Sequence, residues 1–538
     1  MGSYSYRRYP YRAPAECARG RAPVVIVGAG LAGPTLALSL AQRGVHSVLL
    51  DEEDTVSLGS RSICQAKATL EVWDRFGLAE RMVEKGITWE QGEVYLRDSA
   101  IYRFNLTADP HQKFPAFVNL QQYYVEEYLY ECCLAEDAID MRFRHKVVGV
   151  SQTADRATVE IETADGRYSI DADYVVACDG VRSPVRHSLG LAYPGEVFHD
   201  QFLITDVRFK GELPKERRFW FYPPFHPTNS VLLHRQADNV IRVDFQLGRD
   251  ADAEEEKKAE NVDRRLRQMF GPDAQWDHEW TSVYTFSCRM MERFVHGRVI
   301  FAGDAAHVVS PFGARGGNGA VADVDNLAWK LALVLDGRAP ASLLDSYDFE
   351  RRAAARENIL NSTRSTDFIT PKFPASRHFR DATLALARDF PFARALINSG
   401  RLSVPTLQAD SPIDTPDSDE WAGGPGPGRA MIDAPLVNGG DGWLIDRTGS
   451  GFAVLAFGDE LPPLSLPVTG LMVTRGAARP PPKGWTPLRD VEGIAHRRYD
   501  ARPGTTYLIR PDRYVGGRWR SFATQSLEAA LKRGMGHG

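Results

Sequence analysis

The chain has 538 residues, of which 43% are hydrophobic, and its 65 basic and 70 acidic side chains leave a formal net charge of −5. This length allows three or four domains with ordinary hydrophobic cores, and the nearly balanced charge gives no reason to expect a nucleic acid or an anionic membrane as partner. No uninterrupted apolar run reaches the roughly 18 residues of a membrane-spanning helix.

The start of the chain is rich in tyrosine and arginine and lacks the apolar segment of a secretory signal. We therefore expect residues 1–22 to form a disordered N-terminal extension. The six cysteines are scattered and include no CxxC pair. This pattern is typical of free thiols in a reducing compartment, so we expect a cytoplasmic protein without a disulfide framework or a metal site.

A strand, a glycine-rich turn and a helix come first in the folded part of the chain. The β-branched run 24–27 predicts a buried parallel strand, and a helix is predicted over 31–43. Between them stand Gly28, Gly30 and Gly33. The first two would make a tight turn and let the backbone approach a phosphate, and the third lets the helix pack closely on the strand.

The next strand ends in an acidic residue. Residues 48–50 are apolar and run into Asp51, close to the usual ~20 residues after the first glycine at which a carboxylate binds ribose hydroxyls. The N-terminal N–H groups of the intervening helix would point at a pyrophosphate. Together these elements predict a dinucleotide-binding unit, and a structural turn without a ligand is the alternative.

Further segments alternate between this unit and a second domain. The loop 59–62 has the sequence Gly-Ser-Arg-Ser, residues 94–104 alternate like a strand of a second domain, and Gln121 and Gln122 open a helix. The strand 174–177 then leads into Cys178-Asp179-Gly180-Val181-Arg182-Ser183.

Residues 195–287 are aromatic, rich in strand signals and without a glycine fingerprint. Strands are expected over 230–236 and 240–247. In the second of these, the period of two places Arg242, Asp244 and Gln246 on one face and apolar residues on the other.

A second glycine-rich segment comes after the apolar strand signal at 299–302. It begins with Gly303-Asp304-Ala305-Ala306-His307 and continues with Pro311-Phe312-Gly313-Ala314-Arg315-Gly316-Gly317-Asn318-Gly319 before a strongly apolar helix. We expect this segment to close over the other end of the same dinucleotide. One dinucleotide held by two distant segments points to FAD, and therefore to redox chemistry.

Three motifs, in this order and spacing, resemble those of the group A flavoprotein monooxygenases, the para-hydroxybenzoate hydroxylase family. They are Gly28-x-Gly30-x-x-Gly33, Asp179-Gly180-x-Arg182-Ser183, and Gly303-Asp304-Ala305-Ala306-His307 with Pro311. The loop 312–318 and the long trailing segment are most similar to the 3-(3-hydroxyphenyl)propionate hydroxylase and phenol hydroxylase branch. The usual glutamine of that loop is replaced here by Arg315.

The resemblance implies an α/β fold of three domains. A Rossmann-like FAD-binding domain over 23–92, 122–194 and 288–370 would carry an inserted mixed β-sheet substrate domain over 93–121 and 195–287. A helical segment and linker over 371–429 would lead to a C-terminal thioredoxin-like domain over 430–538. Since that last segment has no CxxC, it would not be a disulfide catalyst, and we expect it to pack at the interface of a homodimer.

The resemblance also implies roles for the matching residues. Asp304 would accept a hydrogen bond from a ribityl hydroxyl, and a plain helix N-cap is the alternative. The N–H groups of Gly316, Gly317 and Asn318 would face the edge of the flavin that becomes anionic on reduction. The expected cofactor-binding residues are Gly28, Gly30, Gly33, Asp51, Arg61, Gln122, Asp179, Gly303, Asp304, Pro311, Gly316, Gly317 and Asn318. Gln121 is the alternative to Gln122, and His307 is expected to be structural.

The activity implied is FAD-dependent hydroxylation of a phenolic ring ortho or para to its hydroxyl, through a C4a-hydroperoxyflavin, with NADH or NADPH and O2 as co-substrates. The cofactor carries this chemistry, so no catalytic side chain and no metal ligand are assigned. No second GxGxxG is present, as expected for a nicotinamide nucleotide that binds transiently.

In the family, the strand region after residue 195 lies over the flavin. The polar face of 240–247 could therefore hold a phenol hydroxyl or a substrate carboxylate, and a solvated sheet face with a core behind it is the alternative. The substrate candidates are Tyr222, His234, Arg235, Arg242, Asp244 and Gln246. Rival functions are a flavin-dependent dehydrogenase or halogenase on the same fold, or a non-catalytic flavin-binding sensor. The lysine-bearing motif with paired tryptophans that is expected of a halogenase is not found in the sequence.

Overall fold

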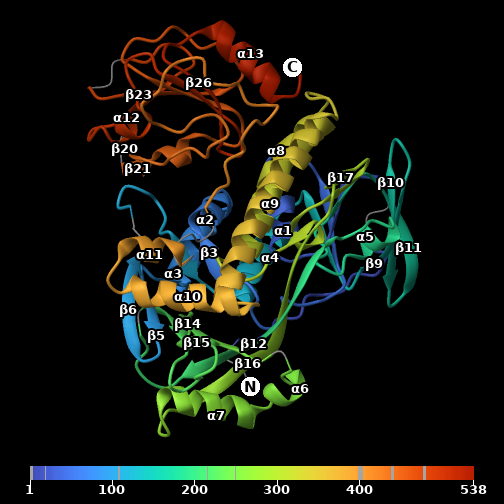
Figure 1. Cartoon of the computed structure of the whole chain (residues 1–538). Coiled ribbons are helices and arrows are strands. Elements are labelled where there is room, and N and C mark those ends of the chain that lie inside the picture. The colour runs from blue at the N-terminus through green and yellow to red at the C-terminus, as the bar shows by residue number, and fades with distance from the viewer. Residues whose placement is uncertain are drawn as a thin grey trace.

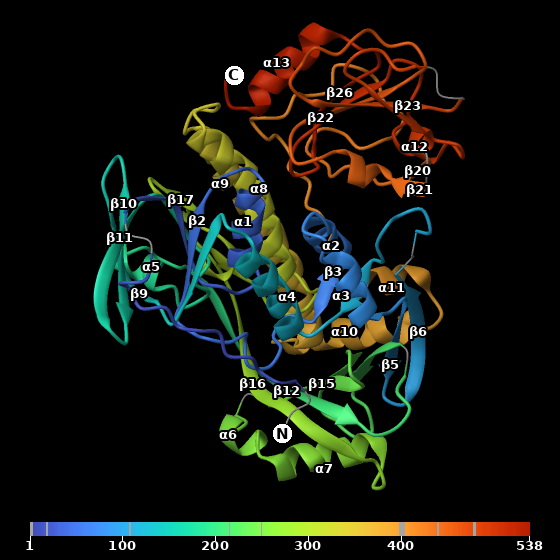
Figure 2. The same ribbon diagram turned by 180° about the vertical axis from the view of Figure 1, so that it is seen from behind.

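The computed structural model describes residues 4–17, 20–106, 109–214, 216–248, 250–397, 404–437, 441–476 and 480–538. A nucleotide-binding domain occupies the middle of the molecule, a second sheet with helix α7 lies at one end, and the C-terminal module lies at the other (Figures 1 and 2). Among these residues, no helix combines the length and the apolar character needed to cross a membrane. The α/β class predicted from the sequence is confirmed.

A mostly parallel sheet forms the centre of the nucleotide-binding domain, in the order β17-β18-β11-β1-β2-β8, with β10 and β9 added to β11. Because β1 is covered on both faces, Val24, Val25 and Ile26 are fully buried. The strands are β1 Ala22–Val27, β2 Ser47–Asp51, β8 Ile139–Phe143, β9 Lys146–Gln152, β10 Ala157–Thr163, β11 Gly166–Ala177, β17 Val295–His296 and β18 Val299–Phe301. The predicted strand–turn–helix–strand unit is present, with parallel pairing of β1 to both β2 and β11.

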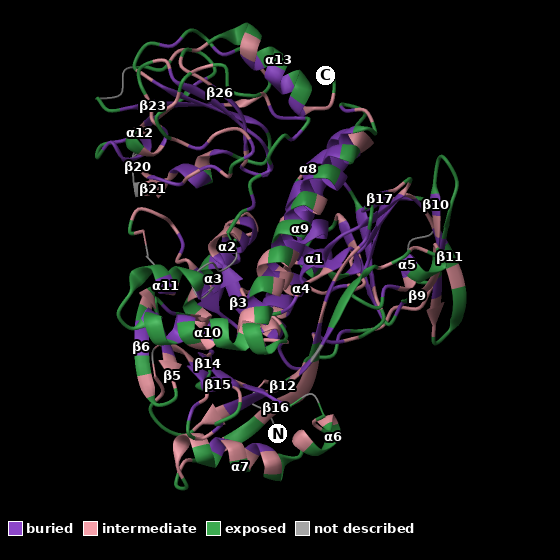
Figure 3. Ribbon diagram, in the orientation of Figure 1, coloured by how far each residue is buried: buried purple, intermediate pink, exposed green. Residues whose placement is uncertain are grey.

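Helices cover this sheet, and the two longest, α8 and α9, come directly after the second glycine-rich turn. Helix α8 is buried along nearly its whole length and contacts α1, α2 and α9 (Figure 3). The helices are α1 Ala32–Ala41, α2 Lys67–Asp74, α3 Ala79–Lys85, α4 Gln122–Ala135, α5 Pro184–Ser188, α8 Gly316–Leu335 and α9 Leu343–Ile369, with a 3-10 turn at Gly303–Ala305.

The second domain is built on a sheet in the order β19-β16-β12-β15-β14-β13-β5-β6. The chain enters this sheet from three separate parts of the sequence. Its strands are β5 Gln91–Leu96, β6 Ser99–Asn105, β12 Gly195–Phe209, β13 Arg217–Phe221, β14 Ser230–Arg235, β15 Val240–Gln246, β16 Trp276–Met290 and β19 His307–Val308. Neighbouring small elements are β3 Cys64–Ala66, β4 Ile87–Thr88, β7 Phe117–Asn119, α6 Ala253–Glu256, α7 Ala259–Phe270, α10 Pro374–Ala387 and α11 Pro391–Leu396.

The two faces of this sheet differ, as the period of two in β15 predicted. One face carries Ile241, Val243 and Phe245 into a core with Val262 and Leu266 of α7. The opposite face carries Arg242, Asp244 and Gln246 toward the nucleotide-binding domain. Arg242 and Gln246 are buried there. The alternative of a solvated polar face is therefore wrong.

The C-terminal module holds a sheet in the order β21-β20-β24-β23-β22-β25-β26, with β22, β23 and β24 parallel and β25 and β26 antiparallel. Its elements are β20 Pro435–Val437, β21 Asp441–Trp443, a 3-10 turn Leu444–Arg447, β22 Ala453–Phe457, β23 Thr469–Thr474, β24 Thr486–Arg489, α12 Ile494–Arg498, β25 Thr506–Ile509, β26 Val515–Trp519 and α13 Thr524–Gly534. The thioredoxin-like assignment of this module stays a prediction.

The N-terminal segment differs from the expectation of a disordered extension over 1–22. Tyr9 is 3% exposed and stacks on Phe143 with ring centroids 4.7 Å apart. The ring of Tyr4 lies against that of Tyr123, with centroids 4.2 Å apart. Aromatic rings bury much apolar area, which offsets the entropy lost in ordering a segment that has no regular secondary structure. Residues 4–17 therefore belong to the packed domain.

A buried ionic network holds the C-terminal module against α8 and α9. Glu350 of α9 accepts from Lys330 of α8 at 2.6 Å and from Arg510 of the module at 2.7 Å. Arg510 also pairs with Asp414 at 3.0 Å and Asp512 at 2.7 Å. Burial acts to raise the pKa of Glu350, but the charges of Arg510 and Lys330 outweigh it and leave that pKa lowered. The network thus docks the module on these two helices in one arrangement.

We expect Arg510→Met to lower the free energy of unfolding by about 3–5 kcal/mol, because it leaves buried carboxylates without their partner. Urea unfolding followed by circular dichroism measures the change. Arg338→Met is the matched control, because its ion pair with Asp336 lies on the surface, and we expect it to cost under ~1 kcal/mol. Equal effects of the two substitutions would contradict a structural role for the network.

Candidate functional site

The turn after β1 leaves no room for side chains. Gly28 has φ +98°, and a Cβ there would lie 2.5 Å from the carbonyl oxygen of Cys178. A Cβ on Gly33 would lie 2.0 Å from the carbonyl oxygen of Gly28. At Gly30, in contrast, a Cβ would meet no described atom within 4 Å. The turn is therefore packed on its protein side and open where a phosphate would approach.

Asp51 lies beside this turn. Its Oδ2 accepts the N–H of Ala29 at 2.6 Å, and its Oδ1 accepts the N–H of Glu53 at 2.8 Å. Burial raises the pKa of Asp51 to about 6, and the two N–H donors act against that rise. A carboxylate at the end of β2 is thereby fixed in orientation next to the glycines, where it can accept a ribose hydroxyl.

The second motif touches the first. The Cα of Asp179 lies 2.9 Å from the position of a Cβ on Gly28. Its Oδ2 accepts from the hydroxyl of Ser183 at 2.8 Å and from the N–H of Val185 at 3.2 Å. Its Oδ1 is buried and has no hydrogen-bond partner among the described residues. Burial raises the pKa of Asp179 to about 6, so a ligand that donates to Oδ1 would offset a desolvation cost.

A buried cluster of charged residues supports the turn of the third motif, Gly303 to His307. Asp323 of α8 accepts from the N–H of Gly303 at 3.0 Å, from Nε2 of His307 at 2.7 Å and from Nε of Arg351 at 2.7 Å. Burial acts to raise the pKa of Asp323, but His307 and Arg351 lower it to about 2. His307 thus has a structural role in this buried cluster.

The side chain of Asp304 lies outside this buried cluster. No hydrogen bond from a described residue reaches its carboxylate, and its side chain is exposed to solvent. The surrounding protein raises the pKa of Asp304 through desolvation, while His307 and Arg61 act to lower it. The backbone oxygen of Asp304 accepts from the hydroxyl of Tyr193 at 2.8 Å, so the carboxylate is free to meet a ligand while its backbone is fixed.

The N-terminus of α8 comes up against the first turn. A Cβ on Gly317 would lie 2.6 Å from Oγ of Ser62 and 3.0 Å from Cδ1 of Leu31. Within the described residues no side chain caps this helix. The N–H groups of its first turn, including that of Gly316 after the Pro311 loop, are therefore available to an anionic ligand.

Asn318 differs from its two glycine neighbours because its side chain is fully used inside the protein. Its Oδ1 accepts from the N–H of Ala66 at 2.9 Å and from the hydroxyl of Thr69 at 2.7 Å. Its Nδ2 donates to the carbonyl oxygens of Cys64 and Ala314. Only the backbone of Asn318 can therefore serve a cofactor.

Arg315, the residue that replaces the family's glutamine, turns away from the first turn of α8. It is 4% exposed, and its Nη1 donates to Oδ1 of Asn358 in α9 at 3.0 Å. This contact ties the loop to α9.

The loop 59–62 joins the two domains. Ser62 donates its N–H to Oε1 of Gln122 at 3.0 Å, whereas Gln121 donates to the carbonyl oxygen of Ala237 in the second domain. Gln122 therefore supports the loop that carries Arg61. The Arg61 side chain is exposed and interacts electrostatically with Asp304.

Of the substrate candidates, His234, Arg242 and Asp244 lie together on the polar face of the sheet. Arg242 pairs with Asp206 through two contacts of 2.8 Å and also donates to the carbonyl oxygen of Ser60. The Oδ1 atom of Asp244 and the Nδ1 atom of His234 are buried without a partner among the described residues. Burial lowers the pKa of His234 well below its usual range, and the nearby Arg217 and Arg242 act in the same direction.

The other three candidates are arranged differently. Gln246 is on the same face but accepts from the N–H and hydroxyl of Ser230. Arg235 pairs in register with Ile241, which puts it on the α7 side. Tyr222 lies at the edge of the domain, 3.5 Å from a carboxylate oxygen of Asp381 and under the guanidinium of Arg380.

Sequence reasoning missed Asp206 and Arg217, which share the polar face with His234, Arg242 and Asp244. We call these five residues the polar patch. Arg217 and Phe219 are two residues apart in β13 and therefore lie on one face of the sheet. The period of two could thus have identified Arg217. Asp206 could not have been found in this way, because its partner Arg242 is known only from the pairing of β12 with β15.

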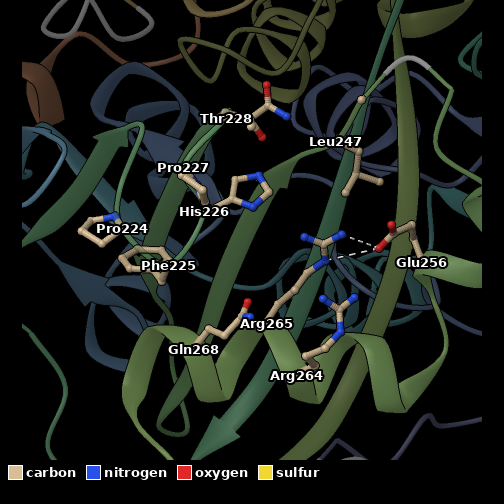
Figure 4. Close-up of a pocket in the computed structure, with 12 residues that line it drawn as sticks. Pro224, Phe225, His226, Pro227, Thr228, Leu247, Glu256, Arg264, Arg265 and Gln268 are labelled. Carbon is tan, nitrogen blue, oxygen red and sulfur yellow. Dashed lines mark hydrogen bonds and ion pairs between the residues drawn. The ribbon is translucent and has the colours of Figure 1, made fainter.

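A hollow of about 750 Å³ lies on the other, α7 side of this sheet (Figure 4). Arg264 and Arg265 of α7 and His226 line it, and Arg265 pairs with Glu256 at 2.6 Å. The Nε2 atom of His226 lies 2.7 Å from the carbonyl oxygen of Gln246. Because the sheet separates this hollow from the glycine-rich turns, the hollow is not part of the candidate FAD site.

Comparisons with known proteins identify the family of this chain and several of its relatives. The FAD binding domain family matches residues 21–362. A 3-(3-hydroxy-phenyl)propionate/3-hydroxycinnamic acid hydroxylase of Mycolicibacterium gilvum is 30% identical over 456 residues, which cover 81% of this chain and 76% of that protein. A 12-dehydrotetracycline 5-monooxygenase/anhydrotetracycline 6-monooxygenase of Streptomyces rimosus is 31% identical over 68% of this chain and 73% of its own length.

A solved structure shares the fold over nearly the whole chain. The flavin-dependent monooxygenase PieE in complex with FAD and substrate superposes with a TM-score of 0.81 at 22% identity, covering 96% of this chain and 99% of that one.

We expect Gly33→Ala to lower the FAD content of the purified protein at least tenfold, because its methyl group would displace the first turn from α1. The ratio of flavin absorbance to protein absorbance measures this. Gly451→Ala is the matched control, since a Cβ there meets no described atom within 4 Å. Normal flavin content in Gly33→Ala would argue against the turn as the cradle.

Asp323→Asn should destabilise the protein at neutral pH. Since the folded-state pKa of Asp323 is about 2 and the usual value is about 3.9, its stabilisation is present above pH ~4 and is lost as the pH falls toward 2. We expect the difference in unfolding free energy between the wild type and the variant to be constant from pH 7 to 5 and to shrink below pH 4. Urea unfolding at several pH values measures it, and a difference that grows on acidification would contradict the assignment.

Proposed function

Because this chain belongs to the FAD binding domain family, we propose that it is an FAD-dependent monooxygenase that hydroxylates a phenolic ring ortho or para to the hydroxyl. NADH or NADPH and O2 are the proposed co-substrates of this single-component enzyme. When bound, the flavin supplies the redox chemistry. The protein supplies binding, orientation and exclusion of water.

One observation supports the proposal above all others. The first glycine turn and the N-terminus of α8 are in contact, with a Cβ on Gly317 lying 3.0 Å from Leu31. Around that contact stand two carboxylates with an unused oxygen, Asp179 and Asp304. A protein that bound nothing here would leave the buried Oδ1 of Asp179 unsatisfied at a cost, whereas the exposed carboxylate of Asp304 would meet only water.

The chain's own residues fit FAD in an extended conformation. Asp51 would accept ribose hydroxyls and the open side of Gly30 would face the pyrophosphate, with Arg61 nearby as a positive charge. Asp304 would accept a ribityl hydroxyl. The first-turn N–H groups of α8 would stabilise negative charge on the flavin ring, since a helix N-terminus favours an anion.

The substrate is proposed to lie between that ring and the polar patch. The relative from Mycolicibacterium gilvum is named for 3-(3-hydroxy-phenyl)propionate, which carries a hydroxyl on its aromatic ring. A ring hydroxyl can both donate and accept a hydrogen bond. It therefore suits the polar patch, which offers both donors and acceptors.

A dehydrogenase or halogenase on the same fold, or a flavin-binding sensor, would use the same cradle. Oxygen stoichiometry separates a dehydrogenase from a hydroxylase, because a dehydrogenase does not insert oxygen into the product. Product mass separates a halogenase, whose product gains a halogen atom, and a sensor would form no product. The proposed homodimer and the role of the C-terminal module at its interface are separate from the chemistry, and gel filtration tests them.

We expect the purified protein to be yellow and to oxidise NAD(P)H faster when a phenol is added. A panel of hydroxybenzoates, resorcinols and phenylpropanoids, with product masses, tests this, and the product should gain one oxygen atom from O2.

Asp304→Ala should weaken FAD binding at least tenfold, whereas Asp277→Ala on the exposed end of β16 should not. A colourless protein that takes up no FAD would falsify the proposal.

A further inference from the structure

One residue of the polar patch lies midway between the two loops that would hold the flavin. On the sheet face, Arg242 and Asp206 form one row, and that row contacts the carbonyl oxygen of Ser60 in the loop 59–62. Phe202, which pairs with Gln246, lies 5.4 Å from the ring of Phe312 in the loop after Pro311. Asp244, paired with Ile204 and Leu232, occupies the row between them.

The carboxylate of Asp244 has no partner that explains its burial. Its Oδ1 is buried without a hydrogen bond, and no hydrogen bond or ion pair with a described residue engages either of its oxygens. Burial raises the pKa of Asp244 to about 7, although Arg242 and Arg217 act to lower it and Asp206 acts to raise it. A carboxylate in this condition accepts a proton readily.

The charged neighbours of Asp244 come from every element around it, and most are already used. Arg242 of β15 is satisfied by Asp206 of β12. His234 of β14 is kept neutral by burial and by the two arginines. Cys64 of β3 donates to Oδ1 of Asn119, and burial raises its pKa.

Arg217 of β13 is the cation left over. It interacts electrostatically with Asp244 and Cys64, but among the described residues it forms no ion pair, and its guanidinium lies over the ring of Trp89 at 5.6 Å. Arg217 also lines a pocket with Phe312 and Gly313, which belong to the loop after Pro311. An unpaired cation and an unpaired carboxylate that attract each other without touching leave a place for a polar group of a ligand.

We propose, on the basis of the monooxygenase function proposed for this chain, that Asp244 takes the proton of the substrate's ring hydroxyl and that Arg217 stabilises the phenolate that remains. The O–H bond of the phenol breaks and an O–H bond forms on the Asp244 carboxylate, with no change of oxidation state. The negative charge moves from Asp244 to the ring oxygen, where Arg217 and Arg242 favour it.

This transfer prepares the ring for hydroxylation, because a phenolate is richer in electrons at its ortho and para carbons than a phenol. It also selects substrates. A ring ether has no proton to give, so it would leave Asp244 charged and unpaired, and such a buried group rejects a ligand strongly.

The test uses the FAD-loaded enzyme without NAD(P)H, so that only binding is observed. The probe is 3-(3-hydroxy-phenyl)propionate, or the panel phenol that stimulates NAD(P)H oxidation most if this acid does not, with the O-methyl ether of the same compound as control. The near-ultraviolet phenolate band of the bound probe is recorded from pH 5 to 9. For the wild type we expect a phenolate at pH 8 that is lost as the pH falls through about 7, since below that pH Asp244 is already protonated.

Asp244→Asn should lower the phenolate fraction at pH 8 at least tenfold, while the flavin spectrum stays unchanged. Asp244→Glu should restore part of the band, and Asp277→Asn, the same substitution on an exposed end of β16, should behave as the wild type. A bound probe that stays a neutral phenol in the wild type at pH 8, or a band with the same height and midpoint in Asp244→Asn, would overturn the proposal. If the Asp244 variants fail to fold, the wild-type profile still tests the proposal, because a probe that stays a neutral phenol at pH 8, or a band whose midpoint lies far from pH 7, overturns it.

The outcome also separates this proposal from the function on which it rests. A wild type that oxidises NAD(P)H in response to a phenol and hydroxylates it, with unchanged ionisation in Asp244→Asn, keeps the function and removes Asp244 from it. A wild type that binds no FAD or responds to no phenol overturns both.

Discussion

The whole site depends on the close contact between two glycine-rich turns from opposite ends of one domain. Gly33 touches the backbone of Gly28, Gly28 touches the Cys178–Asp179 backbone, and Gly317 touches Leu31 and Ser62. Each contact lies at a distance that a side chain would not allow. Because these turns meet, the N-terminal ends of α1 and α8 converge, and the positive ends of two helix dipoles lie close together, as the proposed binding of FAD requires.

Buried charge fixes the surroundings of this contact. Asp323 pairs with His307 and Arg351 and so supports the turn of the third motif. The pair of Glu350 with Arg510 holds the C-terminal module against α8 and α9. Such networks add little net stability over an apolar core, but an unpaired member is costly. They therefore restrict the helices to one arrangement, in which the first turn of α8 stays aimed at the cradle.

The polar patch is organised differently. Arg242 and Asp206 satisfy each other, while Asp244, His234 and Arg217 keep polar groups that no described residue satisfies. A protein that maximised stability would not leave such groups on a buried face. Their desolvation is the cost expected if this face meets a hydroxylated ring, as the proposed function requires.

Local elements could be predicted from the sequence alone: the strand, glycines and helix at 24–43, the acid at the end of β2, and the two faces of β15. Each is set by short-range periodicity or by a backbone conformation that only glycine adopts easily. The sequence did not show that Arg235 faces α7, that Gln122 rather than Gln121 supports the loop 59–62, or that Tyr4 and Tyr9 pack on the domain. These points, and the pairing of Arg242 with Asp206, were settled by the folded arrangement, since they depend on which strands and loops lie side by side, and no local pattern encodes that.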